Sequence, residues 1–135
     1  METNDSELET VDLGDVDELF RIGREVTFQP GQVIFEGGDE ADSVFVVLEG
    51  EAQVDVGGRF HRLTRGDVFG EMAVLAPGRR LAAVTAVEPV RALRVHADAF
   101  RSFLLRHPGL ALSVLRTLVL RLREVEQRID AWMAS

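Results

Sequence analysis

A glycine, a carboxylate and an arginine at fixed spacing form the segment of this chain best suited to chemistry. Gly70 and Glu71 stand at the head of a predicted helical turn over residues 70–73, and Arg80 follows nine residues after Glu71. The first N–H groups of a helix lack intrahelical partners and favour an anion. A guanidinium adds a charge-assisted contact to phosphate, and a carboxylate accepts a hydrogen bond from a hydroxyl. The trio predicts a site for a small phosphodiester that carries a hydroxyl group.

Short β-strands separated by turns must hold these three residues in place. Turns about every eight to twelve residues are typical of an antiparallel barrel or jelly roll. The predicted strands are Val26–Phe28, Gln32–Phe35, Ser43–Leu48, Glu51–Val56, Arg59–Leu63, Leu81–Val87 and Arg91–Val95. We expect Ser43–Leu48 and Glu51–Val56 to form a hairpin through Glu49-Gly50, and we expect Arg80 to lie on the strand that continues to Val87.

Helical periodicity flanks the predicted strands on both sides. A short amphipathic helix is expected over Asp15–Ile22, a second over Ala97–Arg106, and a third from Pro108 to about residue 133. Apolar residues of the third helix recur at alternating spacings of four and three: Ala111, Leu115, Leu118, Leu122, Val125, Ile129 and Trp132. This heptad seam either packs against the strands or pairs with a second copy as a parallel coiled coil. The second interpretation is favoured, because the seam runs past what a small barrel covers, and it predicts a homodimer.

The composition excludes several kinds of catalytic and metal site. The chain has no cysteine, lysine or tyrosine, and all 15 basic residues are arginine. Thiolate nucleophiles, zinc–thiolate sites, Schiff-base lysines and the lysine of a phosphate-binding P-loop are therefore unavailable. The three histidines, His61, His96 and His107, are far apart in sequence and form no paired metal-binding motif. We expect a binding protein that holds no metal and is not an enzyme.

Charge is distributed unevenly along the chain. The net charge is −8, and residues 1–20 contain eight acidic residues and no basic one. We interpret residues 1–14 as a solvated, disordered acidic tail, with an interaction or autoinhibitory arm as the alternative. No basic stripe is present, so this chain alone is not expected to bind nucleic acid. The longest apolar stretch, Leu110–Leu120, is broken by Arg116, and the acidic N-terminus differs from a signal peptide, which together predict a cytoplasmic protein without a membrane anchor.

The chain from about Asp15 to Arg128 resembles the cyclic-nucleotide-binding domain family, which includes catabolite activator protein-like and protein kinase A regulatory subunit-like domains. The resemblance rests on Phe69-Gly70-Glu71, on Arg80-Leu81-Ala82-Ala83-Val84 and on the glycines Gly31, Gly38, Gly50 and Gly66. It implies a mainly β fold: an antiparallel β-roll or jelly-roll barrel over about residues 25–95 with a short N-terminal helix, a helix in the phosphate-binding cassette and two C-terminal helices. The domain would then occupy residues 15–135.

The resemblance also implies a ligand and a set of contacts. The ligand would be cyclic AMP or, alternatively, cyclic GMP, and binding would rearrange the C-terminal helices. Arg80, rather than Arg79, would contact the phosphate, and Glu71 would accept a hydrogen bond from the ribose 2′-hydroxyl. The implied ligand-binding residues are Phe69, Gly70, Glu71, Met72, Ala73, Arg80, Leu81 and Ala82, with Ile129 or Trp132 as a possible cap over the base.

Two positions depart from the pattern of the family. Position 81 is commonly alanine or serine in members that bind cyclic AMP and often threonine in those that bind cyclic GMP, and here it is leucine. Position 83, often threonine or serine, is alanine. Each missing hydroxyl contact costs about 1 kcal/mol. The alternative function is therefore a degenerate domain that binds no nucleotide, serves as a scaffold for dimerisation or interaction, and keeps Glu71 and Arg80 only as a salt bridge.

Overall fold

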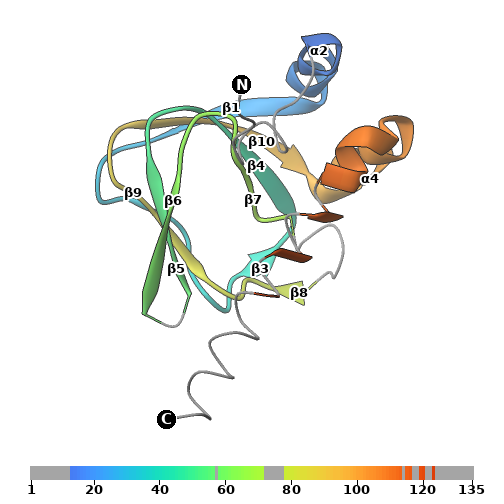
Figure 1. The fold of residues 1–135 in the computed structure, drawn as a ribbon. Coiled ribbons are helices and arrows are strands. Elements are labelled where there is room, and N and C mark those ends of the chain that lie inside the picture. The colour runs from blue at the N-terminus through green and yellow to red at the C-terminus, as the bar shows by residue number, and fades with distance from the viewer. Residues whose placement is uncertain are drawn as a thin grey trace, which may run out of the picture.

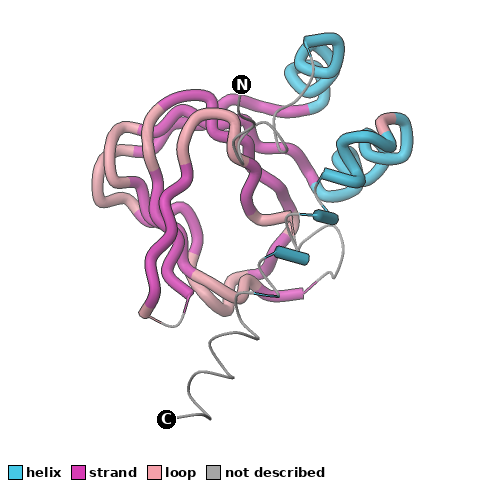
Figure 2. Tube along the Cα trace, in the orientation of Figure 1, coloured by secondary structure: helices cyan, strands magenta, loops and turns pink. Residues whose placement is uncertain are grey.

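The computed structural model describes residues 13–56, 58–71, 78–113, 115–116, 119–120 and 123 of the 135-residue chain. Within these residues two four-stranded antiparallel sheets face each other and form a β-roll, with helices at one side (Figures 1 and 2). The first sheet contains, in order, β1 (Gly23–Phe28), β10 (Val90–His96), β4 (Ser43–Glu49) and β7 (Val68–Phe69). The second contains β2 (Val33–Phe35), β9 (Ala83–Ala86), β5 (Ala52–Val56) and β6 (Arg59–Leu63). The predicted fold class is confirmed.

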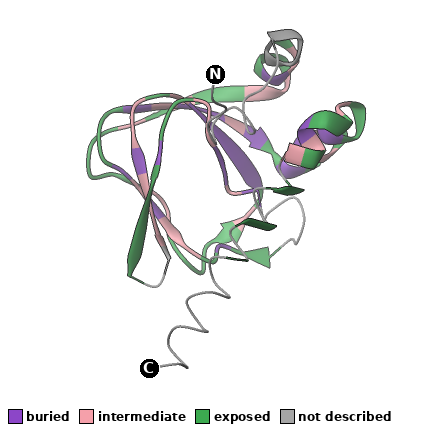
Figure 3. Ribbon diagram, viewed as in Figure 1, coloured by how far each residue is buried: buried purple, intermediate pink, exposed green. Residues whose placement is uncertain are grey.

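Strand β4 is buried on both faces and links two hydrophobic clusters. Its residues from Ser43 to Val47 are all buried (Figure 3). Phe45 and Val47 face the interior of the roll with Phe69 and Ala92, whereas Val44 and Val46 pack under the helices. A strand covered on both faces reads as a continuous apolar run rather than an alternating one. This explains the unbroken run of apolar residues after Ser43.

The helices cover the outer face of the first sheet. α2 (Leu13–Ile22) and α4 (Ala97–Arg106) contribute Leu19, Phe100 and Phe103 to the cluster that also holds Val44 and Val95. α4 spans the same residues as the predicted helix, and α2 begins two residues earlier than expected. Residues 108–113 are helical as well.

A carboxylate ties α2 to the C-terminal end of α4. Glu18 accepts a hydrogen bond from Arg106, and its Oε1 lies 2.9 Å from Nε2 of His107. The main-chain N–H of His107 caps α4 through Leu104, while its carbonyl accepts the first hydrogen bonds of the next helix. His107 and Arg106 lower the pKa of Glu18, in that order of effect, against a smaller opposing effect of burial. Glu18 of α2 thereby holds the connection between α4 and the helix that starts at residue 108.

The predicted hairpin of Ser43–Leu48 with Glu51–Val56 is wrong. β4 pairs with β10 and β7, while β5 pairs with β6 and β9, so Glu49-Gly50 carries the chain from one sheet to the other. Gly50 has φ +95°, and a Cβ there would stand 2.1 Å from the carbonyl oxygen of Pro89. The hairpin is instead formed by β5 and β6. The glycine signals a close approach of two backbone segments, and not a two-strand turn.

Arg80 also departs from its predicted place on a strand. It lies between β8 (Gly78–Arg79), which pairs with β3 (Glu40–Ala41), and β9, which begins at Ala83. Its main-chain N–H donates to the carbonyl of Asp39 at 2.7 Å, and its own carbonyl accepts from the N–H of Gly38 at 2.8 Å. The backbone of Arg80 is therefore held by the loop before β3 rather than by the second sheet.

Several predicted features lie outside the described residues. These are the acidic tail up to residue 12, the cassette residues Met72 and Ala73, the seam residues Leu118, Leu122 and Val125, and the possible base cap at Ile129 and Trp132. In the part of the chain that is described, no helix is both long and apolar enough to cross a membrane.

Candidate functional site

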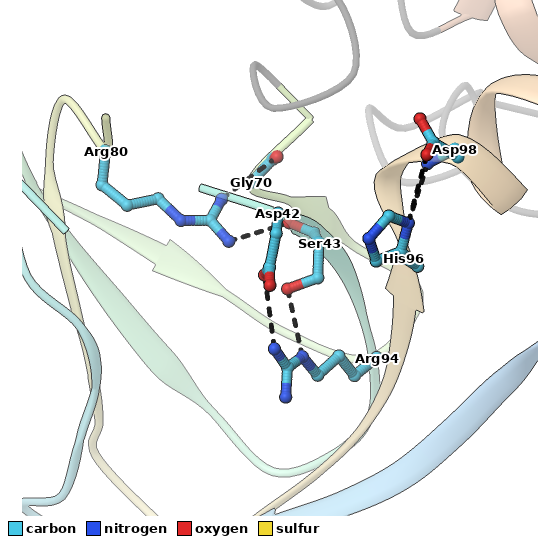
Figure 4. Close-up of polar contacts among 7 residues, drawn as sticks. All are labelled: Asp42, Ser43, Gly70, Arg80, Arg94, His96 and Asp98. Atoms are coloured by element: carbon cyan, nitrogen blue, oxygen red, sulfur yellow. Dashed lines mark hydrogen bonds and ion pairs between the residues drawn. The ribbon is translucent and has the colours of Figure 1, made fainter. Parts of the chain in front are cut away.

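The guanidinium of Arg80 is buried beside the start of the cassette. Arg80 is 8% exposed, and the main-chain contacts described above aim its side chain at β4 and β7. Nη2 donates to the carbonyl of Ser43 at 2.8 Å, and Nη1 donates to the carbonyl of Gly70 at 3.3 Å (Figure 4). Both partners are neutral carbonyl oxygens. Neutral acceptors do not neutralise the positive charge of the guanidinium, so that charge can still attract an anion.

An aromatic ring supports the same guanidinium from one face. Cζ of Arg80 lies 4.0 Å from the ring centroid of Phe35 and 5.9 Å from that of Phe45. Stacking of this kind orients the planar group and offsets part of its desolvation. Nε is buried and has no hydrogen-bond partner among the described residues. Burial and, less strongly, the charge of Arg94 lower the pKa of Arg80, while the nearby charges of Asp42, Asp39 and Glu71 oppose that shift.

Gly70 is required by both its backbone conformation and its surroundings. Its φ is +80°, a left-handed conformation in which a side chain is strained. A Cβ at this position would stand 2.7 Å from Nη1 of Arg80 and 3.3 Å from the carbonyl oxygen of Ser43. Glycine therefore lets the chain turn out of β7 while the arginine lies against its backbone.

The two neighbours of Gly70 in the motif have different environments. Phe69 is 2% exposed and stacks on Phe45, with ring centroids 5.0 Å apart, so its side chain belongs to the core. This packing leaves only the backbone of Phe69 for the predicted ligand contact, which stays a prediction. Glu71 is 4% exposed, and its negative charge raises the pKa of Arg80. The structure thus brings together Gly70, Glu71 and Arg80, as the spacing predicted.

The residues around Arg80 in the sequence point elsewhere. Leu81 is 80% exposed, so its side chain extends into solvent and adds no bulk beside the guanidinium. Arg79 is exposed and donates to the carbonyl of Gly38 at 2.9 Å. Ala82 is partly buried just before β9. Of the two consecutive arginines, Arg80 is the one that enters the interior, in agreement with the prediction.

A cavity of about 550 Å³ opens beside Arg80 and is lined by residues of β1, β2, β4 and β10. Apolar side chains, among them Phe28, Ile34 and Phe35, form part of its lining. A cavity of this size accommodates a small ligand. Its polar lining residues are Glu25, Thr27, Asp39, Glu40, Asp42, Ser43, Arg80 and Arg94.

Apart from Arg80, none of the polar residues of this lining was predicted as a site residue, and three of them contact one another. Arg94 of β10 donates through Nε to Oγ of Ser43 at 3.1 Å and through Nη2 to Oδ1 of Asp42 at 3.3 Å (Figure 4). Burial raises the pKa of Asp42, but hydrogen bonds from Ser43 and Arg94 outweigh it, so the net shift is downward. Only the pairing of β4 with β10 joins these residues, and no local sequence signal reveals it.

Comparisons with known proteins agree with this geometry. The model of the cyclic nucleotide-binding domain matches residues 25–107. A CRP-like cAMP-activated global transcriptional regulator of Mycobacterium tuberculosis is 30% identical over 110 residues, which cover 77% of this chain and 49% of the regulator. A cGMP-dependent protein kinase of Toxoplasma gondii is 45% identical over 62 residues, or 45% of this chain and 6% of the kinase. The chain thus spans about half the length of the mycobacterial regulator.

A solved structure extends the similarity to three dimensions. The crystal structure of Thermus thermophilus catabolite activator protein superposes with a TM-score of 0.77 at 26% sequence identity, covering 93% of this chain and 62% of the other. The family match takes in both sheets, the Gly70–Glu71 segment and Arg80. With more than half of its residues matched to the family, this chain belongs to the cyclic nucleotide-binding domain family.

Proposed function

We propose that this domain is a regulatory sensor that binds a cyclic nucleotide at Arg80 and Gly70. The observation that carries the proposal is the buried guanidinium of Arg80, whose Nε has no partner among the described residues, at the wall of a cavity of about 550 Å³. Its Nη atoms donate to neutral carbonyls, so an incoming phosphate replaces neutral acceptors with a charged one that can accept two parallel hydrogen bonds. Its role is binding and not catalysis, and this chain alone does not engage nucleic acid.

The proposed contacts divide the ligand between three residues. Arg80 binds the exocyclic phosphate oxygens, and the backbone of Gly70 approaches the same phosphate because no side chain intervenes. Glu71, 4% exposed, accepts a hydrogen bond from the ribose 2′-hydroxyl. Contacts by Met72 and Ala73 and a cap from Ile129 or Trp132 remain predictions from the sequence.

Cyclic AMP is the proposed ligand, with cyclic GMP as the alternative. The similar mycobacterial regulator is named as cAMP-activated, whereas the similar Toxoplasma kinase is named as cGMP-dependent. Leu81 lacks the hydroxyl that threonine would offer, which disfavours cyclic GMP. Because 80% of its surface is exposed, Leu81 does not narrow the site. The missing hydroxyl contact costs about 1 kcal/mol, which lowers affinity several-fold without abolishing binding.

The signal is proposed to leave through the C-terminal helix. Leu110 is buried with α4, whereas Leu112, Leu115 and Val119 on the following turns are 67%, 53% and 41% exposed. A ligand shifts such a helix only if it binds one arrangement more tightly than the other. The test is amide hydrogen exchange of residues 109–113 with and without ligand, with β6 as the internal reference. Equal exchange rates would refute this route.

A second copy is the proposed partner for the exposed face of this helix. Leu115 belongs both to that face and to the heptad seam of the sequence, and a heptad seam is self-complementary in a parallel pair. We expect a dimer by light scattering and a monomer after Leu115→Glu, with Arg116→Glu on the neighbouring position as the control. A monomeric wild-type protein would refute the dimer.

Isothermal titration with cyclic AMP and cyclic GMP tests the binding function. Arg80→Gln is expected to weaken binding at least about 100-fold, because two hydrogen bonds between charged groups contribute about 3–6 kcal/mol. Arg79→Gln removes the same charge from the adjacent exposed position and is expected to bind like the wild type. Arg80→Lys keeps the buried positive charge, so it serves as a second variant in case Arg80→Gln loses nucleotide affinity only because it is misfolded. Equal affinity in Arg80→Gln would refute the site, and a folded wild-type protein that binds neither nucleotide would support the scaffold alternative.

A further inference from the structure

Ser43 connects the two arginines that line the cavity. Its carbonyl accepts from Nη2 of Arg80 at 2.8 Å, and its hydroxyl accepts from Nε of Arg94 at 3.1 Å. Figure 4 shows Arg80 and Arg94 approaching Ser43 from different sides, with the carboxylate of Asp42 turned toward Arg94. Ser43 is 2% exposed, so both contacts are anchored to a buried point of β4. A substitution of either arginine therefore alters a residue, Ser43, that also hydrogen-bonds the other arginine.

Asp42 is the acidic residue with the strongest influence on Arg80. Of the carboxylates around that guanidinium, Asp42 raises its pKa most, ahead of Asp39 and Glu71. Asp42 also lies next to Ser43 in the sequence and lines the same cavity as Arg80. It is the natural competitor of an anionic ligand for Arg80.

The present partners of Arg80 are weaker than a carboxylate. The Nη atoms donate to two main-chain carbonyls, and Nε donates to no described residue. These bonds already have a charged donor, but a carboxylate adds a charge on the acceptor and can bind the guanidinium through two parallel hydrogen bonds. If Asp42 turned to Arg80, a phosphate would have to displace a charged partner instead of a neutral one.

Arg94 is the charged partner of the Asp42 carboxylate, which also has a hydrogen bond with Ser43. Nη2 of Arg94 lies 3.3 Å from Oδ1 of Asp42, and both side chains are partly exposed, at 40% and 58%. We propose that Arg94 is a positioning residue that holds Asp42 away from Arg80 and thereby maintains the affinity of the site for the phosphate of its ligand. The inference rests on the proposed function, and it assigns a role to a residue that does not itself need to touch the ligand.

The first test compares two arginines of the same strand. Arg94→Ala is expected to weaken cyclic AMP binding about three- to five-fold, the upper part of the range that an exposed ion pair of at most about 1 kcal/mol supports. Arg91 is the matched control: it lies on β10, is also 40% exposed and pairs with Glu25 and Glu49. Glu25 lines the cavity, but it is not among the charges that shift the pKa of Arg80. Arg91→Ala removes the same charge and is expected to leave affinity within about two-fold of the wild type, as for a screened surface charge. Equal affinities of the Arg94 and Arg91 variants would overturn the proposal.

A double-mutant cycle separates positioning from simple attraction. If Arg94 acted only through its charge, Asp42→Asn would change affinity by the same factor with and without Arg94. If Arg94 restrains Asp42, Asp42→Asn is nearly silent in the wild type and restores most of the affinity lost in Arg94→Ala. Additive effects would overturn the inference. Arg94→Gln repeats the cycle with a smaller loss of volume in case the alanine variant is poorly folded.

A ligand-free readout distinguishes failure of the inference from failure of the proposed function. The Nε–Hε resonance of Arg80, identified by its loss in Arg80→Gln, reports what that side chain contacts. It is expected to shift in Arg94→Ala but not in Arg91→Ala, and to return in the Arg94→Ala, Asp42→Asn variant. A wild-type protein that binds no cyclic nucleotide would refute the proposed function. An unchanged resonance in Arg94→Ala would refute the restraint of Asp42 even if the ligand binds.

Discussion

Replacement of Gly70 by alanine tests how firmly the Arg80 side chain is held. The new Cβ would meet Nη1 of Arg80 at 2.7 Å and the carbonyl oxygen of Ser43 at 3.3 Å, on a backbone with φ +80°. The guanidinium is the more mobile of the two neighbours, so we expect it to give way. It then loses its contact with Gly70 and weakens the 2.8 Å hydrogen bond to Ser43.

The cost divides into a backbone part and a contact part. An alanine in the left-handed region costs about 1–2 kcal/mol. The weakened hydrogen bonds of a charged donor add about 2 kcal/mol. Gly31 supplies the matched control, because its φ is +84° and a Cβ there would meet nothing within 4 Å. We therefore expect Gly31→Ala to lower the free energy of unfolding by about 1–2 kcal/mol and Gly70→Ala by about 3–4 kcal/mol.

Equilibrium urea unfolding followed by far-ultraviolet circular dichroism measures both values. Similar m-values in the variants would show that the comparison concerns the folded state. The contact part is expected to disappear when Gly70→Ala is combined with Arg80→Gln, because the shorter side chain leaves room for the methyl group. If Gly70→Ala and Gly31→Ala differed by less than about 0.5 kcal/mol, within ordinary additivity error, the guanidinium would not be fixed where the structure places it.

Two further predictions concern residues outside the site. Gly50→Ala is expected to destabilise the domain more than Gly31→Ala, although the two glycines have similar φ values. A Cβ at position 50 would stand 2.1 Å from the main-chain oxygen of Pro89, which cannot move aside as a side chain can. Equal urea midpoints of the two variants would contradict this. Glu18→Gln is expected to lower the Tm at neutral pH. Because the folded protein lowers the pKa of Glu18, the ionised carboxylate stabilises the fold fully above the ordinary carboxyl pKa of 4.5, and this stabilisation is lost as the pH falls through the lowered pKa. The Tm difference from the wild type is therefore expected to shrink as the pH is lowered below 4.5. Asp17→Asn at an exposed position is the control, and a pH-independent difference for Glu18→Gln would contradict the assignment.

The fold was largely predictable because its signals are local. Turn spacing and the change from strand to helical periodicity lie within short windows of sequence, and they predicted the β-roll and α4. The pairing partner of β4 was not predictable from such windows. Since β4 is covered on both faces, its apolar run has no alternation that assigns it to a sheet, and the Glu49-Gly50 turn imitates a hairpin.

The site was predictable only in part. Gly70, Glu71 and Arg80 follow a spacing that carries its own chemistry. Asp42 and Arg94 are separated by 52 positions and meet only through the pairing of β4 with β10. Arg80 was placed on a strand because the apolar run after it looks continuous, whereas its backbone bonds to Gly38 and Asp39 instead. The cytoplasmic location and the absence of catalysis stay predictions.

Strand β4 has a consequence for how this sequence can vary. Alternate residues of the strand lie in two different environments: Phe45 lies inside the roll, whereas Val44 and Val46 lie under the helices. Ser43, at the start of the strand, hydrogen-bonds both Arg80 and Arg94. A substitution that changes the volume on one face shifts the backbone that the other face shares, because close-packed interiors transmit displacement. Tolerated changes along β4 should therefore arise as compensated pairs across the strand. Exposed strands such as β6, with four of five residues open to solvent, can change one position at a time.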